Sequence, residues 1–216
     1  MIVVDARTEP LEAVLEQAAR VVFGGGTIVF PNDTSYAIGC DPFDSRAIDR
    51  IYAAKGRPDE RPLTLHVATP QEFLEYAGDN QLAMLAAKRL LPAPVILRIR
   101  KPPFVSDELA AALQTLAIRV PDDPLARAIL DRCGPLAATT VNSPGRRYAG
   151  DGDRSWLPEA DLLIERGPAR YDRESTIVDL TGAHARLVRE GALSEEELVE
   201  LLGPIERPIV KVRSQS

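Results

Sequence analysis

The segment KGRPDERPLTLHV, residues 55–67, brings three basic side chains together in a short stretch. Lys55, Arg57 and Arg61 are interleaved with a glycine and a proline, residues that indicate a stiff loop. An arginine offers a planar fork of hydrogen-bond donors and a lysine a compact point charge, and together they suit a polyphosphate. The alternative is a solvated turn in which the intervening acidic residues pair with these cations. We expect the loop to bind an anion that carries several charges.

Arg119 is a further candidate, because it lies inside the apolar segment TLAIRV at residues 115–120. Burying a guanidinium is costly unless an anion meets it. The sequence allows two kinds of anionic partner for Arg119. One is a ligand carboxylate, which arginine binds through two parallel hydrogen bonds. The other is a structural ion pair with an internal Asp or Glu.

Short polar or basic side chains stand beside several of the predicted strands. They are Thr34, Thr140, Asn142, Ser175 and Arg189. Strand ends are where α/β sheets usually present ligand-binding groups. Each of these residues, taken alone, is also compatible with an ordinary turn.

His66 lies at the centre of the apolar stretch LTLHV, where its simplest interpretation is a core histidine with satisfied hydrogen bonds. The sequence has two histidines and two well-separated cysteines, Cys40 and Cys133, which is too few for a zinc site of the usual His/Cys type. We expect the cysteines to be reduced and any metal to be bound by oxygen.

Several common catalytic motifs are absent from the sequence. It lacks the G-x-x-x-x-G-K-[ST] phosphate loop, the G-x-G-x-x-G dinucleotide fingerprint and the G-x-S-x-G elbow of serine hydrolases. Without a nucleophile paired to a base, chemistry must come from positioned cations, hydroxyls and backbone amides. Those groups favour phosphoryl or nucleotidyl transfer.

The chain has 216 residues, enough for one domain with a substantial core. Its formal net charge of −6 argues against a protein whose whole surface follows a nucleic-acid backbone. No segment reaches the ~18 apolar residues that a membrane-spanning helix needs, and the N-terminus lacks the basic and apolar regions of a leader peptide. We expect a cytoplasmic protein with a single domain over residues 1–205 and a flexible tail over 206–216.

Hydrophobic periodicity and capping residues predict the elements that position these side chains. We expect helices over residues 9–23, 44–55, 70–77, 79–90, 122–132 and 194–202. We expect strands over residues 27–30, 62–67, 95–99, 115–120, 135–140, 161–164, 175–180 and 185–190, and a loop that joins strand to helix over residues 31–41. This alternation predicts a mixed α/β sheet with helices packed on it.

The order of the sequence blocks resembles the YrdC-like family, the L-threonylcarbamoyladenylate synthases, over residues 10–193. That family reads PTDTVYGLG, KGRP-x-x-NPL, an apolar strand with His, PGP before a strand, VR-x-P, a Ser-Ala-Asn loop, and ST-V-D followed by R-x-G. This sequence supplies PNDTSYAIG, KGRPDERPL, LTLHV, PAPVIL, IRVP, TTVN, STIVD and REG.

The resemblance implies an open, twisted α/β sheet with a cationic concave face, in a short, single-domain form of the family. It also implies an ATP-dependent nucleotidyl transfer. L-Threonine and bicarbonate would give a carbamate that attacks the α-phosphate of ATP, leaving threonylcarbamoyl-AMP and pyrophosphate. In the family, a carbamoyltransferase complex then modifies an adenosine beside the anticodon of certain tRNAs. Mg²⁺ is expected to accompany ATP.

The resemblance also implies a role for each matching residue. The residues that would face ATP, with Lys55 and Arg57 as the catalytic pair, are Lys55, Arg57, Arg61, Asn142 and Arg189. The residues that would face threonine, with Arg119 on its carboxylate, are Thr34, His66, Arg119, Thr140 and Ser175.

The sequence departs from the family pattern on the amino-acid side of the pocket. Asn32 replaces a threonine, Ser35 replaces a valine, and Thr140 stands where serine is usual. Such departures also resemble a paralogous branch whose substrate need not be the same. Lys55 and Asn142, which that branch tends to lose, are present here, so an active synthase is the preferred interpretation.

Two other functions stay open. One is a paralogue in which the cationic face is an RNA-binding module without turnover, or which uses a different amino acid. The weaker one is a carbamoyl-phosphate-using domain such as those of hydrogenase maturation proteins. Those domains occur in longer chains with zinc-finger cysteines that this sequence lacks.

Overall fold

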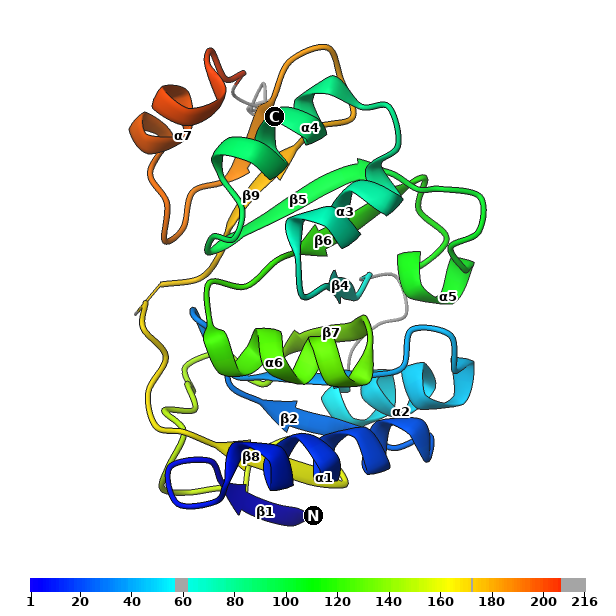
Figure 1. Ribbon diagram of the computed structural model, residues 1–216, viewed down its shortest axis with the longest axis vertical. Helices are drawn as coiled ribbons and strands as arrows, with labels where there is room; N and C mark the ends of the chain where they lie inside the picture. Colours follow the sequence, from blue (N-terminus) through cyan, green and yellow to red (C-terminus); the bar gives the residue numbers. More distant parts are fainter. Residues whose placement is uncertain (57–61, 172, 207–216) are drawn as a thin grey trace, which may run out of the picture.

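The structure is a computed structural model that describes residues 1–56, 62–171 and 173–206 (Figure 1). The strands are β1 (Ile2–Asp5), β2 (Ile28–Phe30), β3 (Ala37–Cys40), β4 (Thr64–His66), β5 (Val95–Arg100), β6 (Thr115–Arg119), β7 (Leu136–Thr140), β8 (Leu162–Glu165), β9 (Thr176–Asp179) and β10 (Arg186–Arg189). The helices are α1 (Leu11–Phe23), α2 (Ser45–Lys55), α3 (Pro70–Ala77), α4 (Gln81–Arg89), α5 (Asp107–Ala110), α6 (Pro124–Cys133) and α7 (Glu195–Leu202).

The ten strands of the described part form one sheet in the order β1-β8-β2-β3-β7-β4-β6-β5-β9-β10. The β1/β8, β2/β8, β4/β6 and β5/β9 pairs are parallel. The β2/β3, β3/β7, β4/β7, β5/β6 and β9/β10 pairs are antiparallel. The predicted α/β class, an open mixed sheet with helices packed on it, is confirmed.

Local capping signals position the helices as expected. The side chains of Asp44 and Asp123 accept hydrogen bonds from the first-turn amides of α2 and α6. Ser194 and Glu197 form the capping box of α7. Because α2 ends at Lys55, the first residue of the KGRP segment stands at a helix C-terminus.

Strand β3 corrects the prediction that residues 31–41 are a loop joining a strand to a helix. All four of its residues are buried, and it pairs with β2 on one side and β7 on the other. Its local sequence has no polar alternation, so its extended state depends on a partner, β7, that is distant along the chain. The short elements β1 and α5 were not predicted.

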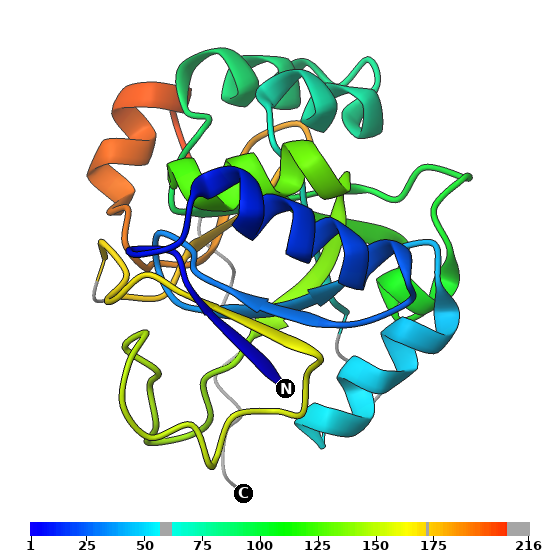
Figure 2. The same cartoon turned by 60° about the horizontal axis from the view of Figure 1, so that its bottom comes forward.

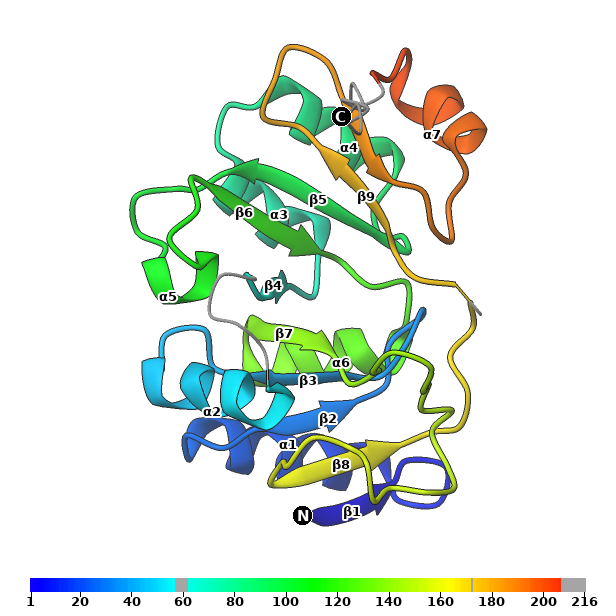
Figure 3. The ribbon, with the colours of Figure 1, turned by 180° about the vertical axis from the view of Figure 1, so that it is seen from behind.

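Helices cover both faces of the sheet and divide the core into two clusters. α1 and α6 pack side by side, with Phe30 and Ala138 among the residues beneath them (Figure 2). α2 lies on the other face of this half of the sheet, where Ile48 and Ile51 join the cluster of Ile38 (Figure 3). α3 and α4 lie over β5 and β6 (Figure 1). The sheet is thus a fixed frame for side chains that project from its strands.

No helix within residues 1–56, 62–171 and 173–206 is long and apolar enough to span a membrane. The predicted tail begins at Glu206, whose backbone bonds to the chain around β10. The Leu187 amide donates to the Glu206 carbonyl at 2.9 Å, and the Glu206 amide donates to the Ala185 carbonyl at 2.8 Å. The rest of that tail, 207–216, lies outside the described residues.

Candidate functional site

A cavity of about 560 Å³ lies against one face of the sheet. Its floor is built from alternate residues of neighbouring strands, because side chains at i and i+2 share a face. Thr64 and His66 of β4 stand beside Ala117 and Arg119 of β6 in register. The small side chains of Ala117 and Ala138 leave open space between the polar ones. A cavity of this size suits a small-molecule ligand.

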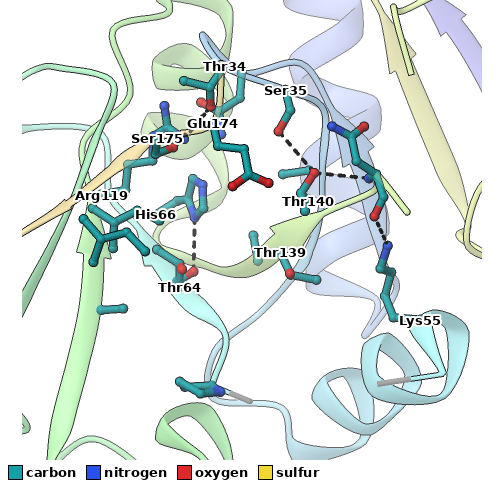
Figure 4. A pocket seen from close by; sticks show the side chains of 18 of the residues that line it. Thr34, Ser35, Lys55, Thr64, His66, Arg119, Thr139, Thr140, Glu174 and Ser175 are labelled. Atoms are coloured by element: carbon teal, nitrogen blue, oxygen red, sulfur yellow. Dashed lines mark hydrogen bonds between the residues drawn. The ribbon is translucent and has the colours of Figure 1, made fainter. Parts of the chain in front are cut away.

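Every predicted site residue that the structure describes lines this one cavity. These residues are Thr34, Lys55, His66, Arg119, Thr140, Asn142, Ser175 and Arg189. Figure 4 shows Lys55 on the opposite side of the cavity from Thr34, Arg119 and Ser175. The other two predicted residues, Arg57 and Arg61, lie outside the described residues.

The guanidinium of Arg119 is buried and forms an ion pair with Asp33. Asp33 is therefore the internal carboxylate that the sequence left open as a partner of Arg119. Its second oxygen accepts a hydrogen bond of 3.0 Å from the Asp122 amide. The pair fixes the orientation of Arg119 at the edge of the cavity.

Arg119 also organises two hydroxyl groups. Its Nη1 donates to Thr34 Oγ1 at 2.9 Å and to Ser175 Oγ at 2.6 Å. The two hydroxyl oxygens are 3.3 Å apart. Because a guanidinium can only donate, each hydroxyl accepts from it, and one of the two hydroxyls also donates to the other in this structure. Both hydroxyl hydrogens can rotate toward a ligand oxygen, so the two hydroxyls beside a cation suit a carboxylate.

His66 is buried at the floor of the cavity. Its Nδ1 lies 3.1 Å from the Thr64 carbonyl oxygen, which can only accept, so Nδ1 carries the hydrogen. Burial, assisted by the Arg119 charge, lowers the pKa of His66 to about 3. The imidazole is thus neutral at physiological pH, and its Nε2 offers a lone pair at the cavity. The interpretation of His66 as a core histidine holds for Nδ1, which bonds to the Thr64 carbonyl, whereas Nε2 faces the cavity.

Lys55 joins helix α2 to the end of strand β7. Gly56 ends the helix in the left-handed region, with φ 53°, a conformation in which glycine is unstrained. The Lys55 Nζ donates to the carbonyl oxygens of Val141 and Asn142, both at 2.9 Å. The Asn142 amide in turn donates to Thr140 Oγ1 at 3.1 Å. One ammonium therefore holds the polar turn that follows β7 against the cavity.

Tyr148 fixes the segment that follows β7, of which Asn142, Ser143, Pro144 and Arg147 form one wall of the cavity. Its amide donates to Asn142 Oδ1 at 3.1 Å, and its hydroxyl donates to the buried carboxylate of Glu165. Arg154 donates two more hydrogen bonds to Glu165, at 2.8 and 2.6 Å. Burial raises the pKa of Glu165, but the hydrogen bonds from Arg154 and Tyr148 outweigh it and hold the pKa below its usual value. Hydrogen bonds to Glu165 therefore fix this segment at Tyr148 and at Arg154.

Three charged lining residues were missed by the sequence analysis. Arg98 of β5 faces the cavity, and its alternation with buried neighbours was the available signal. Arg147 donates to the Thr34 carbonyl at 3.3 Å, and no local pattern marked it as a ligand-binding residue. Glu174 precedes Ser175, and no local pattern distinguished it from a solvated acid.

The electrostatic character of the cavity is basic. Its lining carries five basic side chains and, among the residues that the structure describes, one carboxylate, that of Glu174. The basic residues are Lys55, Arg98, Arg119, Arg147 and Arg189. In the described ranges, no three His, Cys, Asp or Glu side chains gather closely enough to hold a metal ion. The arrangement can bind an anion with several charges beside a small polar group.

Comparisons with known proteins match the chain to one family. Residues 20–191 match the family model Sua5_yciO_yrdC, described as "Telomere recombination". The threonylcarbamoyl-AMP synthase of Pyrococcus abyssi is 30% identical over 94% of this chain and 62% of its own length. The chain spans about three fifths of the length of the first curated relatives that it matches.

Two solved structures share the fold. P. abyssi Sua5, determined in complex with L-threonine, aligns with a TM-score of 0.80 and 30% identity over 96% of this chain and 62% of that one. Escherichia coli YciO aligns with a TM-score of 0.76 and 27% identity over 93% of this chain and 98% of that one. The chain therefore belongs to the Sua5/YciO/YrdC family.

Proposed function

We propose that this chain is an ATP-dependent nucleotidyltransferase that forms threonylcarbamoyl-AMP and pyrophosphate from L-threonine, bicarbonate and ATP. The observation that carries the proposal is the composition of this cavity. It presents basic side chains to one ligand and, on the opposite side, two hydroxyls ordered by Arg119 to another. The relatives named threonylcarbamoyl-AMP synthase and the threonine complex of P. abyssi Sua5 support it.

In this proposal the amino acid binds beside Arg119. Its carboxylate accepts from the hydroxyls of Thr34 and Ser175, which accept from Arg119 and exchange the hydrogen bond between them for bonds to the ligand. The neutral His66 Nε2 accepts from a donor of the amino acid, and the hydroxyl of Thr140 closes the same side of the cavity. A zwitterion with a hydroxyl side chain matches this mixture of donors and acceptors.

The nucleotide binds along the basic side of the cavity. Lys55 and Asn142 belong to this side in the proposal, together with Arg57 and Arg61, which lie outside the described residues, and Arg189 reaches the phosphates from beside Ser175. The α-amino group, after losing a proton, attacks the bicarbonate carbon, and water leaves to give the carbamate. The carbamate oxygen then attacks the α-phosphorus, a new O–P bond forms, and the bond to the β-phosphate oxygen breaks with its electron pair leaving on pyrophosphate. The cations offset the charge that develops on the departing pyrophosphate.

Mg²⁺ is proposed to enter as the ATP complex. Its preferred ligands are oxygens, which the phosphates and water supply, and the cavity adds hydroxyl oxygens from Thr139 and Ser143. When bound, the ion would neutralise phosphate charge. A carbamoyltransferase complex that modifies tRNA is the proposed consumer of the product, and a cytoplasmic location stays a prediction from the sequence.

The proposal is tested by measuring pyrophosphate release while each substrate is omitted in turn. We expect release only when ATP, bicarbonate and L-threonine are all present, and a product with the mass of threonylcarbamoyl-AMP. A panel of the other amino acids tests specificity, because Asn32 at the cavity has a buried side-chain oxygen with no partner among the described residues. Release that ignores threonine would refute the substrate assignment. RNA binding that falls steeply with salt, without any ATP turnover, would favour the RNA-binding alternative.

A further inference from the structure

Glu174 is the one carboxylate in a cavity that is otherwise lined by cations and neutral polar groups, among the residues that the structure describes. Figure 4 shows its carboxylate pointing into the cavity. The residue directly precedes Ser175, one of the two hydroxyls that Arg119 orders. A negative side chain at this place opposes phosphate binding, so its presence calls for a positively charged partner.

In this structure that partner is Arg189. Its Nη1 lies 2.6 Å from Glu174 Oε2, while its Nε and Nη2 donate to the Ser175 carbonyl at 3.2 and 2.8 Å. The Glu174 side chain is 67% exposed and that of Arg189 40% exposed. Ion pairs with this exposure add little to stability. A ligand that binds either residue more strongly can therefore separate the pair at a small cost in free energy.

We propose that the Glu174 carboxylate binds the α-ammonium group of the amino-acid substrate. Nucleotide phosphate frees Glu174 for this role by pairing with Arg189 in its place. This inference rests on the proposed function, which supplies both ligands. An amino acid whose carboxylate lies on the Thr34 and Ser175 hydroxyls has its ammonium one carbon away, beside Glu174. The cavity lining that the structure describes offers no other carboxylate for that charge.

The arrangement couples the two ligands. Triphosphate competes with Glu174 for Arg189, and a freed Glu174 then binds the ammonium without a competing cation. Coupling of this kind is reciprocal, so threonine must strengthen nucleotide binding by the same factor as nucleotide strengthens threonine binding. Glu174 is thus a binding residue for one substrate that is regulated by the other.

The test measures equilibrium binding by calorimetry without bicarbonate, so that no carbamate forms. L-Threonine is titrated with and without α,β-methylene-ATP, and the analogue is titrated with and without threonine. The wild-type protein is expected to show roughly fivefold or greater coupling in both directions. Glu174→Gln is expected to bind threonine about tenfold more weakly in the presence of the analogue, because the acceptor for the ammonium loses its negative charge. The same variant should bind the analogue as well as, or better than, the wild type.

Two controls separate this role from a structural one. Glu190→Gln removes the same charge from the neighbouring exposed pair with Arg173, at 3.9 Å, and should leave both affinities unchanged. The analogue of threonine in which a hydroxyl replaces the ammonium, (2S,3R)-2,3-dihydroxybutanoate, should bind the wild type and Glu174→Gln equally.

The outcomes distinguish the two proposals. If Glu174→Gln weakens both ligands equally, or leaves threonine affinity unchanged while the wild type still releases pyrophosphate with threonine, the inference about Glu174 is wrong and the proposed function stands. If the wild type binds no threonine, both are wrong. Opposite effects of Glu174→Gln on the two ligands, with both controls neutral, support the inference.

Discussion

Arg119 and Asp33 form an ion pair in which the arginine side chain is 5% exposed and the aspartate side chain is fully buried. The two residues are far apart in the sequence, and each arrives at the cavity edge from a different element. Removing one partner of such a pair leaves an uncompensated charge in the interior.

We predict that Asp33→Asn lowers the free energy of unfolding by about 3–5 kcal/mol. Urea denaturation followed by circular dichroism measures the change. The matched control is Glu12→Gln, which removes the carboxylate of an exposed pair with Arg132 and should change stability little. Equal effects of the two variants would show that burial of the Arg119 pair does not govern its energy.

The same pair illustrates what the sequence can and cannot predict. The apolar neighbours of Arg119 indicated that it is buried, and they required an anionic partner. Nothing local identified Asp33, because the contact arises only when β6 and the loop after β2 are placed side by side. Caps such as Asp44 were readable from the sequence because their partners lie within one helical turn.

The candidate site was largely predictable for a related reason. Thr140, Ser175 and Arg189 flank strands, and strand ends converge once a sheet forms. Glu174 escaped notice because a search for cations that bind an anion gives no reason to select a carboxylate. β3 escaped notice because its pairing with β7 outweighs the turn-like residues that precede it.

A second prediction concerns the pH dependence of stability. His66 has a pKa of about 3 in the folded protein, lowered by burial and by the Arg119 charge, against about 6.5 in an unfolded chain. As pH falls below 6.5 the unfolded chain gains a proton that the folded protein does not, so stability is lost progressively from pH 6.5 toward pH 3. Between pH 7 and pH 5 this residue should account for a loss of about 2 kcal/mol.

His66→Gln is expected to remove that part of the pH dependence, whatever its own effect on stability at pH 7. Urea denaturation at pH 7, 6 and 5 measures the slope. The only other histidine, His184, is exposed between β9 and β10, and His184→Gln should keep the wild-type slope. An unchanged slope in His66→Gln would mean that His66 is protonated in the folded state or is not buried as described.

A third prediction concerns Tyr148, whose hydroxyl donates to Glu165 and whose backbone holds Asn142. Tyr148→Phe keeps the ring packing against Tyr36, at 5.0 Å between centroids, and removes the hydroxyl alone. We expect a loss of about 1–2 kcal/mol in the free energy of unfolding. We also expect a higher KM for ATP with a smaller change in kcat, because the wall that carries Asn142 is loosened.

Tyr171→Phe is the matched control for this variant. Tyr171 packs under Arg170, with 5.1 Å between the guanidinium carbon and the ring centre, and its ring is enough for that contact. Removing the Tyr171 hydroxyl should leave the free energy of unfolding and the KM for ATP near the wild-type values. A KM for ATP that stays at the wild-type value in Tyr148→Phe would show that the wall does not contribute to nucleotide binding.

The last prediction separates structure from catalysis at Lys55. Its ammonium donates to two carbonyl oxygens at the end of β7, so Lys55→Ala loses two hydrogen bonds and a charge beside the proposed phosphate site. We expect pyrophosphate formation to fall by about 10²–10³-fold, as when one stabilising donor is removed from an active site. Lys101 is the matched control, since its Nζ donates to the Val105 carbonyl at 3.0 Å and to Asp107 at 2.8 Å, away from the cavity. Lys101→Ala should keep full activity even where it unfolds more easily. If the two variants lose activity in proportion to their loss of stability, Lys55 has only a structural role and takes no part in the nucleotidyl transfer.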